Sequence, residues 1–93
     1  MVTQEEINEY FMEAIRYLKA QGNSQKDIVL KARLGQNAIS KIKKGESNAG
    51  DETIRKLAQA FRLNVDFFYG KSTYITLLDK SKDNLDNSIE EAG

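Results

Sequence analysis

Apolar residues recur at intervals of three and four along residues 1–70, which is the spacing of one buried face of an α-helix. Residues 3–21 show this spacing most clearly. Thr3 and Glu6 have the form of a capping box, and acidic residues in a first turn suit the positive end of the helix dipole. We therefore expect a helix over these residues, ended by Gly22. Its inward residues are Ile7, Phe11, Ala14, Ile15 and Leu18.

Four shorter helices are expected after it. Ser24, Asp51 and Asn64 can each cap a helix, because a short side-chain oxygen can accept a hydrogen bond from a free backbone N–H group. The expected helices cover residues 24–31, 36–43 and 51–61 and a brief segment after Asn64. Their inward residues are Ile28, Val29, Ala32, Leu34, Ile39, Ile42, Ile54, Leu57, Ala58, Phe61, Val65, Phe67 and Phe68.

The tail over residues 71–93 does not follow this pattern. Residues 73–78 are rich in β-branched and aromatic side chains, whereas residues 79–91 are mostly polar. A chain of 93 residues can bury one core but not two independent ones. We therefore expect an all-α fold, with a compact five-helix domain over residues 1–70. The tail is then either a dimerisation segment or a linker to a further domain.

The composition excludes several kinds of chemistry. The sequence has no Cys and no His, so disulfides, thiol redox chemistry, zinc sites and imidazole catalysis are excluded together. Acid–base catalysis would need Asp, Glu, Lys or Tyr in a cleft, which a domain of this size rarely has. The glycines are isolated and form no phosphate-binding loop. We expect neither an enzyme nor a cofactor or metal.

The chain shows no signal for export or for a membrane. No stretch approaches the roughly 20 apolar residues that a membrane helix needs. The acidic start up to Glu9 lacks the basic and then apolar layout of a signal peptide. The sequence therefore predicts a cytoplasmic protein without membrane contact.

Positive charge is concentrated in one segment. The formal net charge is +0, which by itself argues against a nucleic-acid ligand, because phosphate contacts supply much of the affinity for DNA. Residues 24–45, however, contain six basic residues and one acidic residue, a charge of +5. A basic segment is either a solvated helix face or a surface for phosphate, and the motif within this one favours the second interpretation.

Two short helices joined by a tight turn, the second with a polar outer face, form a helix-turn-helix. Residues 24–45 fit this arrangement, from Ser-Gln at their start to Lys-Lys-Gly at their end. Together with Asn48 and the string Thr-Ile-Arg-Lys-Leu-Ala-Gln-Ala-Phe over residues 53–61, they resemble the phage repressor and Cro-like helix-turn-helix family, of the xenobiotic-response-element type. The resemblance extends to Gly70. It implies a lambda-repressor-like domain that binds an operator as a dimer, with its third helix in the major groove.

The resemblance also implies which residues face DNA bases. Gln36 and Asn37 match base-facing positions at the start of the third helix, and Lys41 matches one a turn later. Their chemistry agrees, because Gln and Asn amides fit the N6 and N7 edge of adenine and Lys can donate to guanine O6 and N7. Ser40 can touch a phosphate or a thymine methyl group. We therefore predict base contacts from Gln36, Asn37, Ser40 and Lys41.

Contacts with the DNA backbone are expected around this helix. Gln25 matches a DNA-contacting position of the family at the start of the second helix, where free backbone N–H groups also favour an anion. Lys26, Lys43, Lys44 and Asn48 can contact phosphates, and such contacts position a domain without specifying sequence.

Three positions depart from the family pattern. The turn residue that is usually Gly is Arg33, which is strained at positive φ unless Gly35 relaxes the turn or caps the third helix. The Arg that is common near the end of the first helix is Leu18, and the Glu that usually pairs with it is Lys43. Because both partners are replaced together, no unpaired charge is expected in the core.

These features predict a sequence-specific DNA-binding transcriptional regulator, a repressor that reads a palindromic operator through its third helix. The alternative is the antitoxin of a toxin–antitoxin pair, which binds a protein partner through the tail as well as DNA. We expect double-stranded DNA as the ligand and a homodimer. The two copies pair either through Phe67, Phe68 and Tyr69 or through residues 73–78.

Overall fold

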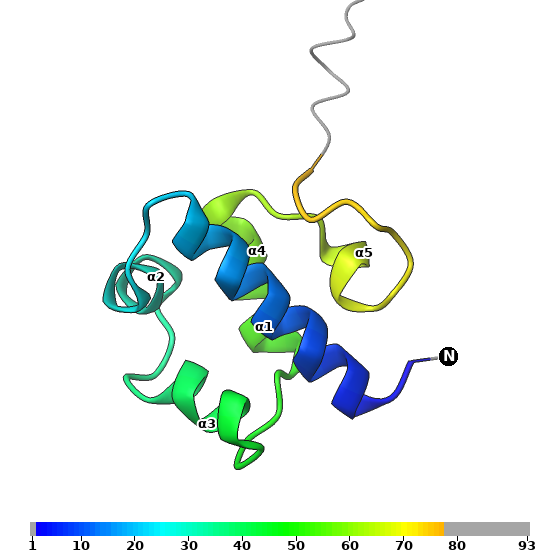
Figure 1. Ribbon diagram of the computed structural model, residues 1–93, viewed down its shortest axis with the longest axis horizontal. Helices are drawn as coiled ribbons and strands as arrows, with labels where there is room; N and C mark the ends of the chain where they lie inside the picture. Colours follow the sequence, from blue (N-terminus) through cyan, green and yellow to red (C-terminus); the bar gives the residue numbers. More distant parts are fainter. Residues whose placement is uncertain (1, 78–93) are drawn as a thin grey trace, which may run out of the picture.

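Five α-helices surround one hydrophobic core in residues 2–77, which are the residues that this computed structural model describes (Figure 1). The helices are α1 (Gln4–Ala20), α2 (Gln25–Ala32), α3 (Ala38–Lys44), α4 (Asp51–Phe61) and α5 (Val65–Phe68). In the view of Figure 1, α1 crosses in front of α4, with α2 and α3 on one side and α5 on the other. The predicted all-α, five-helix fold is confirmed.

Three of the helices begin where a side chain caps them. Thr3 accepts a hydrogen bond from the Glu6 N–H at 3.1 Å, and the Glu6 carboxylate accepts one from the Thr3 N–H at 2.9 Å. Ser24 and Asp27 form the same reciprocal pair at the start of α2, and the Asn64 side chain caps α5. These bonds satisfy backbone donors that a helix leaves free. The predicted caps Thr3, Ser24 and Asn64 are confirmed.

One predicted helix start and one predicted cap are wrong. α3 begins at Ala38 and not at Gln36, because Gln36 and Asn37 form a turn and the Asn37 side chain makes no capping hydrogen bond. α4 has Gly50 as its extended N-cap residue, so Asp51 is the first helical residue and not the cap. α2 and α3 each end one residue later than predicted.

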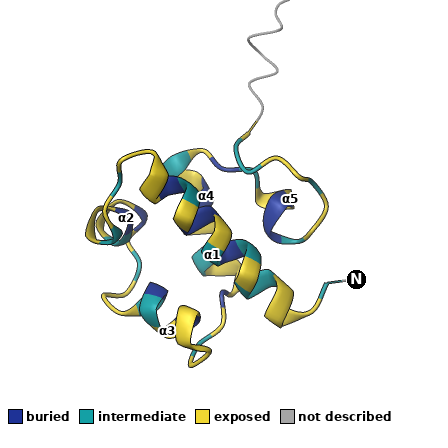
Figure 2. Ribbon diagram, in the orientation of Figure 1, coloured by how far each residue is buried: buried dark blue, intermediate teal, exposed yellow. Residues whose placement is uncertain are grey.

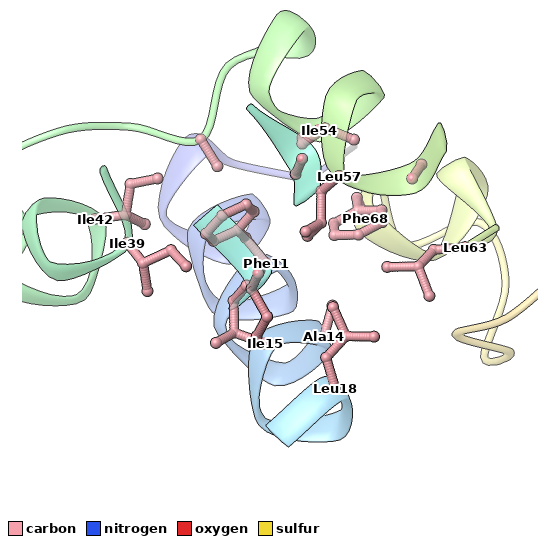
Figure 3. Packing of buried hydrophobic residues seen from close by; sticks show 14 of the residues in the cluster. Phe11, Ala14, Ile15, Leu18, Ile39, Ile42, Ile54, Leu57, Leu63 and Phe68 are labelled. Carbon is pink, nitrogen blue, oxygen red and sulfur yellow. The ribbon is translucent and has the colours of Figure 1, made fainter. Parts of the chain in front are cut away.

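The core combines side chains from all five helices (Figure 3). Phe11 of α1 lies at its centre, with Ile39 of α3 on one side and Phe68 of α5 on the other. Each large side chain that is fully buried stabilises the fold by roughly 1.5–3 kcal/mol. The buried residues are Phe11, Ala14, Ile15, Leu18, Ile28, Ala32, Ile39, Ile42, Ala49, Ile54, Leu57, Ala58, Leu63, Phe67 and Phe68.

Most of the predicted inward residues are buried, and five are not. Val65 is 41% exposed, because α5 has only four residues and turns Phe67 and Phe68 to the core instead. The other four pack against the edge of the core and are partly buried: Ile7, Val29, Leu34 and Phe61.

The chain returns to the domain after α5. Backbone hydrogen bonds of 2.7 and 3.2 Å join residues 62–64 to residues 75–77 in antiparallel fashion, with Leu63 opposite Thr76. The described part of the tail therefore lies against the junction of α4 and α5. The division of the chain at Gly70 stays a prediction.

Candidate DNA-binding surface

The turn between α2 and α3 depends on a residue in the left-handed conformation. Arg33 has φ 58° and ψ 43°, and its N–H donates to the Leu30 carbonyl at 3.3 Å. The next N–H, from Leu34, donates to the Val29 carbonyl at 3.0 Å. A side chain in this conformation costs roughly 1 kcal/mol relative to Gly. Gly35 has no positive φ and is not the cap of α3, so the expectation that it relaxes the turn is wrong.

α3 turns one face to the core and the other to solvent (Figure 2). Ile39 is 1% and Ile42 is 4% exposed, and they anchor the helix. Asn37 and Lys41 are exposed, and Ser40 is half-buried. These three lie on the opposite face, because positions three and four apart share a face of a helix. The groups that α3 offers to a ligand are therefore polar or positively charged.

A hollow of about 680 Å³ lies beside this face, between α2 and the start of α3. Gln36, Asn37 and Lys26 line it, so predicted contacts from α2 and from the turn before α3 border one concave surface. Leu30 also lines it and, at 66% exposed, is the most exposed large hydrophobic residue of the described chain. An apolar side chain beside hydrogen-bonding amides can meet a thymine methyl group in the major groove.

Gln25 is the centre of a chain of hydrogen bonds that joins α1, α2 and α3. The Lys19 ammonium donates to Gln25 Oε1 at 3.1 Å, and Gln25 Nε2 donates to Ser40 Oγ at 3.2 Å. The predicted backbone contact Gln25 and the predicted base contact Ser40 are thus direct partners. Lys19 is not among the residues predicted from sequence. Its only signal is a basic residue in the last turn of α1, which is common because it suits the helix dipole.

Lys43 and Lys44 lie at the other end of α3. Both are exposed and border a second hollow, of about 600 Å³, whose opposite wall includes Glu9 and Glu13 of α1. These acidic side chains lower the positive potential around the two lysines. Leu18, where the family usually has Arg, is 3% exposed in the core. No charged residue is buried among residues 2–77, as expected when both members of the family's ion pair are replaced.

Asn48 is held beside α1 by a small network. Its side-chain oxygen accepts a hydrogen bond from Asn8 Nδ2 at 3.1 Å, and Asn8 Oδ1 accepts one from the Ala49 N–H at 2.8 Å. Gln4 Nε2 donates to the Ala49 carbonyl at 3.1 Å. These bonds fix the loop after α3 to the start of α1. They leave the Asn48 amide N–H groups as donors for a phosphate.

The described residues hold no cluster of three or more acidic side chains placed to bind a metal ion. Within the same part of the chain, no helix combines the length and apolar character that crossing a membrane requires. The surface around α3 is basic and rich in hydrogen-bonding groups, and nucleic acid is the ligand that such a surface fits.

A comparison with protein families covers the same helices. The family model described as Helix-turn-helix matches residues 15–68, from the middle of α1 to the end of α5 and more than half of the chain. Searches of curated proteins and of solved structures found no match. The matched segment contains α2, α3 and the turn between them, which form the DNA-binding unit of the family. The chain belongs to the Cro/C1-type helix-turn-helix family and is a DNA-binding transcriptional regulator.

Proposed function

We propose that this regulator is a sequence-specific repressor that binds a palindromic operator as a homodimer, with α3 of each copy in the major groove. The arrangement of α3 carries the proposal: its apolar face is anchored in the core, while Gln36, Asn37 and Lys41 are exposed at its start and on its outer face. An α-helix fits the major groove, where each base pair presents a distinct pattern of donors and acceptors.

The proposed base contacts are Gln36, Asn37, Ser40 and Lys41. Gln36 and Asn37 lie in the turn that leads into α3, and recognition helices contact base edges with their N-terminal residues. Each amide can pair with the N6 and N7 atoms of adenine, and Lys41 can donate to guanine one turn later. A good bidentate pair contributes about 1–3 kcal/mol of discrimination against the wrong base.

The proposed backbone contacts surround these residues. Gln25 and Lys26 begin α2, Lys43 and Lys44 end α3, and Asn48 follows α3 in the chain. Phosphate contacts supply affinity on any sequence and orient α3 without selecting bases. Because Glu9 and Glu13 lie across the hollow from Lys43 and Lys44, we expect these two lysines to contribute less to the affinity for DNA than Lys26 does.

Repression needs only that the operator be occupied. The proposed contacts all serve DNA binding, which is sufficient to block a promoter, whereas activation needs an additional contact with the transcription machinery. We propose that the protein has no enzymatic activity. We also propose that it is located in the cytoplasm, where it has access to operator DNA. A reporter gene separates the two regulatory roles: expression should fall when the operator overlaps the promoter, and a rise would identify an activator.

A homodimer follows from the small size of the site that one copy reads. One helix-turn-helix contacts only a few base pairs, which is too little to define a site in a genome. Two copies related by a two-fold axis read a palindrome whose half-sites lie about one helical turn apart.

The burial of the two candidate pairing segments favours residues 73–78 over residues 67–69. Phe67 is 5% and Phe68 is 0% exposed, so both side chains are already used inside the domain. Tyr74 and Leu77, in the returning segment formed by residues 73–77, are each 56% exposed. Val65 is exposed beside Leu77 on a shared concave surface. Three of the exposed large hydrophobic side chains therefore belong to the returning segment and its surroundings.

The backbone of the returning segment also has a free edge. Residues 75 and 77 direct their hydrogen-bonding groups to residues 62–64. In an antiparallel pair the residue between them directs its groups the other way, and Thr76 makes no backbone hydrogen bond within the described residues. An unpaired edge of this kind accepts a further strand, which supports pairing with the same segment of a second copy.

The alternative function, that of an antitoxin, concerns the tail. Residues 78–93, which include most of the segment expected to contact a protein partner, lie outside the described residues. A protein partner therefore stays a prediction.

Selection of binding sites from randomised duplex DNA tests the proposal. The protein should select a palindrome, and Gln36→Ala and Asn37→Ala should each relax the preference at particular base pairs and cost about 1–3 kcal/mol on the original site. Gln21→Ala, which changes an exposed amide at the end of α1, is the matched control and should select the original palindrome. If both Gln36→Ala and Asn37→Ala kept the original preference, these residues would not be the readers.

A further inference from the structure

We propose that the Lys19–Gln25–Ser40 hydrogen bonds set the Ser40 hydroxyl as a donor toward DNA, so that Ser40 selects a hydrogen-bond acceptor on a base edge. The inference rests on the proposed function, because it requires α3 to lie in the major groove. It assigns positioning roles to Lys19 and Gln25, and it names the class of base atom that Ser40 recognises.

The orientation of the Gln25 amide is the first step. An ammonium group carries three donors and no acceptor, so the Gln25 atom that lies 3.1 Å from Lys19 Nζ is the amide oxygen. The amide nitrogen is then directed to Ser40 Oγ, 3.2 Å away. Turning the amide over would place two donors against each other at Lys19, so this orientation is the favoured one.

This orientation of the Gln25 amide decides whether the Ser40 hydroxyl accepts or donates. A hydroxyl has one proton and two lone pairs, and Ser40 uses a lone pair to accept the hydrogen bond from Gln25. Among the hydrogen bonds of the described chain, none has Ser40 Oγ as the donor. Ser40 lines the hollow between α2 and α3. Its proton is therefore available to a ligand that enters this hollow.

The major groove offers a limited set of partners for such a donor. Guanine presents N7 and O6, adenine presents N7 and thymine presents O4 as acceptors, whereas cytosine presents only its N4 donor. A donor at Ser40 should therefore disfavour cytosine on the strand that it faces. A phosphate oxygen is also an acceptor, but a contact with it would add affinity without base preference. The face that Ser40 shares with Asn37 and Lys41 favours the base edge.

Site selection from randomised DNA with the full chain tests the inference. Ser40→Ala should reduce the preference against cytosine about 3- to 10-fold at one position of each half-site. This is the change expected from the loss of one hydrogen bond. Ser40→Thr keeps the hydroxyl and should keep the preference. Gln25→Glu should reverse it, because a carboxylate at this place accepts the Ser40 proton and leaves Ser40 only lone pairs. Cytosine should then be favoured at that position.

The charge change in Gln25→Glu needs its own control. Lys26→Gln makes the net charge more negative by the same amount beside the same hollow, without touching Ser40. It should weaken binding on all sequences and leave the base preferences unchanged. Lys19→Met should weaken the preference at the Ser40 position alone, because the amide is then free to turn over. Circular dichroism melting of each variant verifies that the domain is folded.

The outcomes separate this inference from the proposed function. If Ser40→Ala keeps every preference or weakens all sequences alike, while Gln36→Ala relaxes one position, the inference is overturned and the proposed function stands. A Gln25→Glu variant that behaves like Lys26→Gln also overturns it. Unchanged preferences in Ser40→Ala, Gln36→Ala and Asn37→Ala together would contradict the proposed function itself.

Discussion

The Tyr69 hydroxyl donates a hydrogen bond of 2.5 Å to Asp51 Oδ1 and so ties the end of α5 to the first residue of α4. Burial, followed by the hydrogen bond and the negative charge of Asp51, raises the pKa of Tyr69 from 10.0 to about 12, although nearby Arg55 lowers it. The phenol therefore stays protonated, and keeps this bond, up to strongly alkaline pH.

We predict that Tyr69 makes the free energy of unfolding fall between pH 10 and about 12. The folded chain holds this proton more tightly than the unfolded chain, so the contribution is complete below pH 10.0 and is lost as the pH rises through about 12. Urea unfolding across this range measures it. Tyr69→Phe should remove this part of the pH dependence, and Tyr74→Phe, at an exposed tyrosine, should retain it. Identical curves for Tyr69→Phe and the parent protein would contradict the assignment.

Arg33→Gly should stabilise the domain by about 1 kcal/mol, because Gly adopts the left-handed conformation without a Cβ clash. Arg33→Ala loses the same charge but keeps a Cβ, so it should show little of this gain. Thermal unfolding of the two variants gives the comparison. Equal stabilities would show that the turn is not strained by its side chain.

Local pattern was sufficient to predict most of the helices and their caps. Thr3, Ser24 and Asn64 cap as expected because the bonds that they form reach only two or three residues along the chain. The start of α3 was mispredicted since no side-chain bond at Asn37 marks it. Val65 was mispredicted because a helix of four residues is too short to show a periodic face.

Contacts between distant parts of the chain could not be predicted in this way. The pairing of Leu63 with Thr76 depends on how the chain returns after α5. The bond between Gln25 and Ser40 depends on how α2 and α3 pack. The motif therefore predicted which residues surround α3, but the hydrogen bonds that Lys19 and Gln25 make were visible only once the helices were placed.

Phosphate contacts should appear in the salt dependence of binding. Replacing Lys26, Lys43 and Lys44 together by Ala should weaken binding on all sequences. The slope of log affinity against log salt is negative, and its magnitude should shrink by up to about 3, since each phosphate contact contributes about 1. Lys71→Ala, at an exposed lysine between α5 and the returning segment, should leave the slope unchanged. An unchanged slope in the triple variant, measured by titration at several salt concentrations, would rule out the phosphate role.

Thr76→Pro should separate dimerisation from folding. Proline removes the Thr76 N–H, which faces away from residues 62–64, and leaves the backbone groups of Ile75 and Leu77 that hold the segment to the domain. Sedimentation should show a monomer with the parent's helical content by circular dichroism. Leu77→Pro is the counterpart, because it removes the hydrogen bond from the Leu77 N–H to the Arg62 carbonyl. It should lower the stability of the domain in addition to preventing dimerisation.

Truncation provides the complementary test. A protein without residues 73–93 should also sediment as a monomer. It should bind the full palindrome no more tightly than an isolated half-site, because a monomer gains no affinity from the second half-site. If the truncated protein formed the same dimer and bound the full palindrome equally well, the segment would not be the dimerisation element.

A methylation footprint on the selected operator tests most directly whether α3 reads the major groove. Dimethyl sulfate modifies guanine N7, which lies in the major groove, and adenine N3, which lies in the minor groove. The protein should protect guanine N7 atoms in two clusters about one helical turn apart on one side of the duplex, and leave adenine N3 reactive between and within them. Protection of adenine N3 with guanine N7 fully reactive would place the protein in the minor groove and contradict the account.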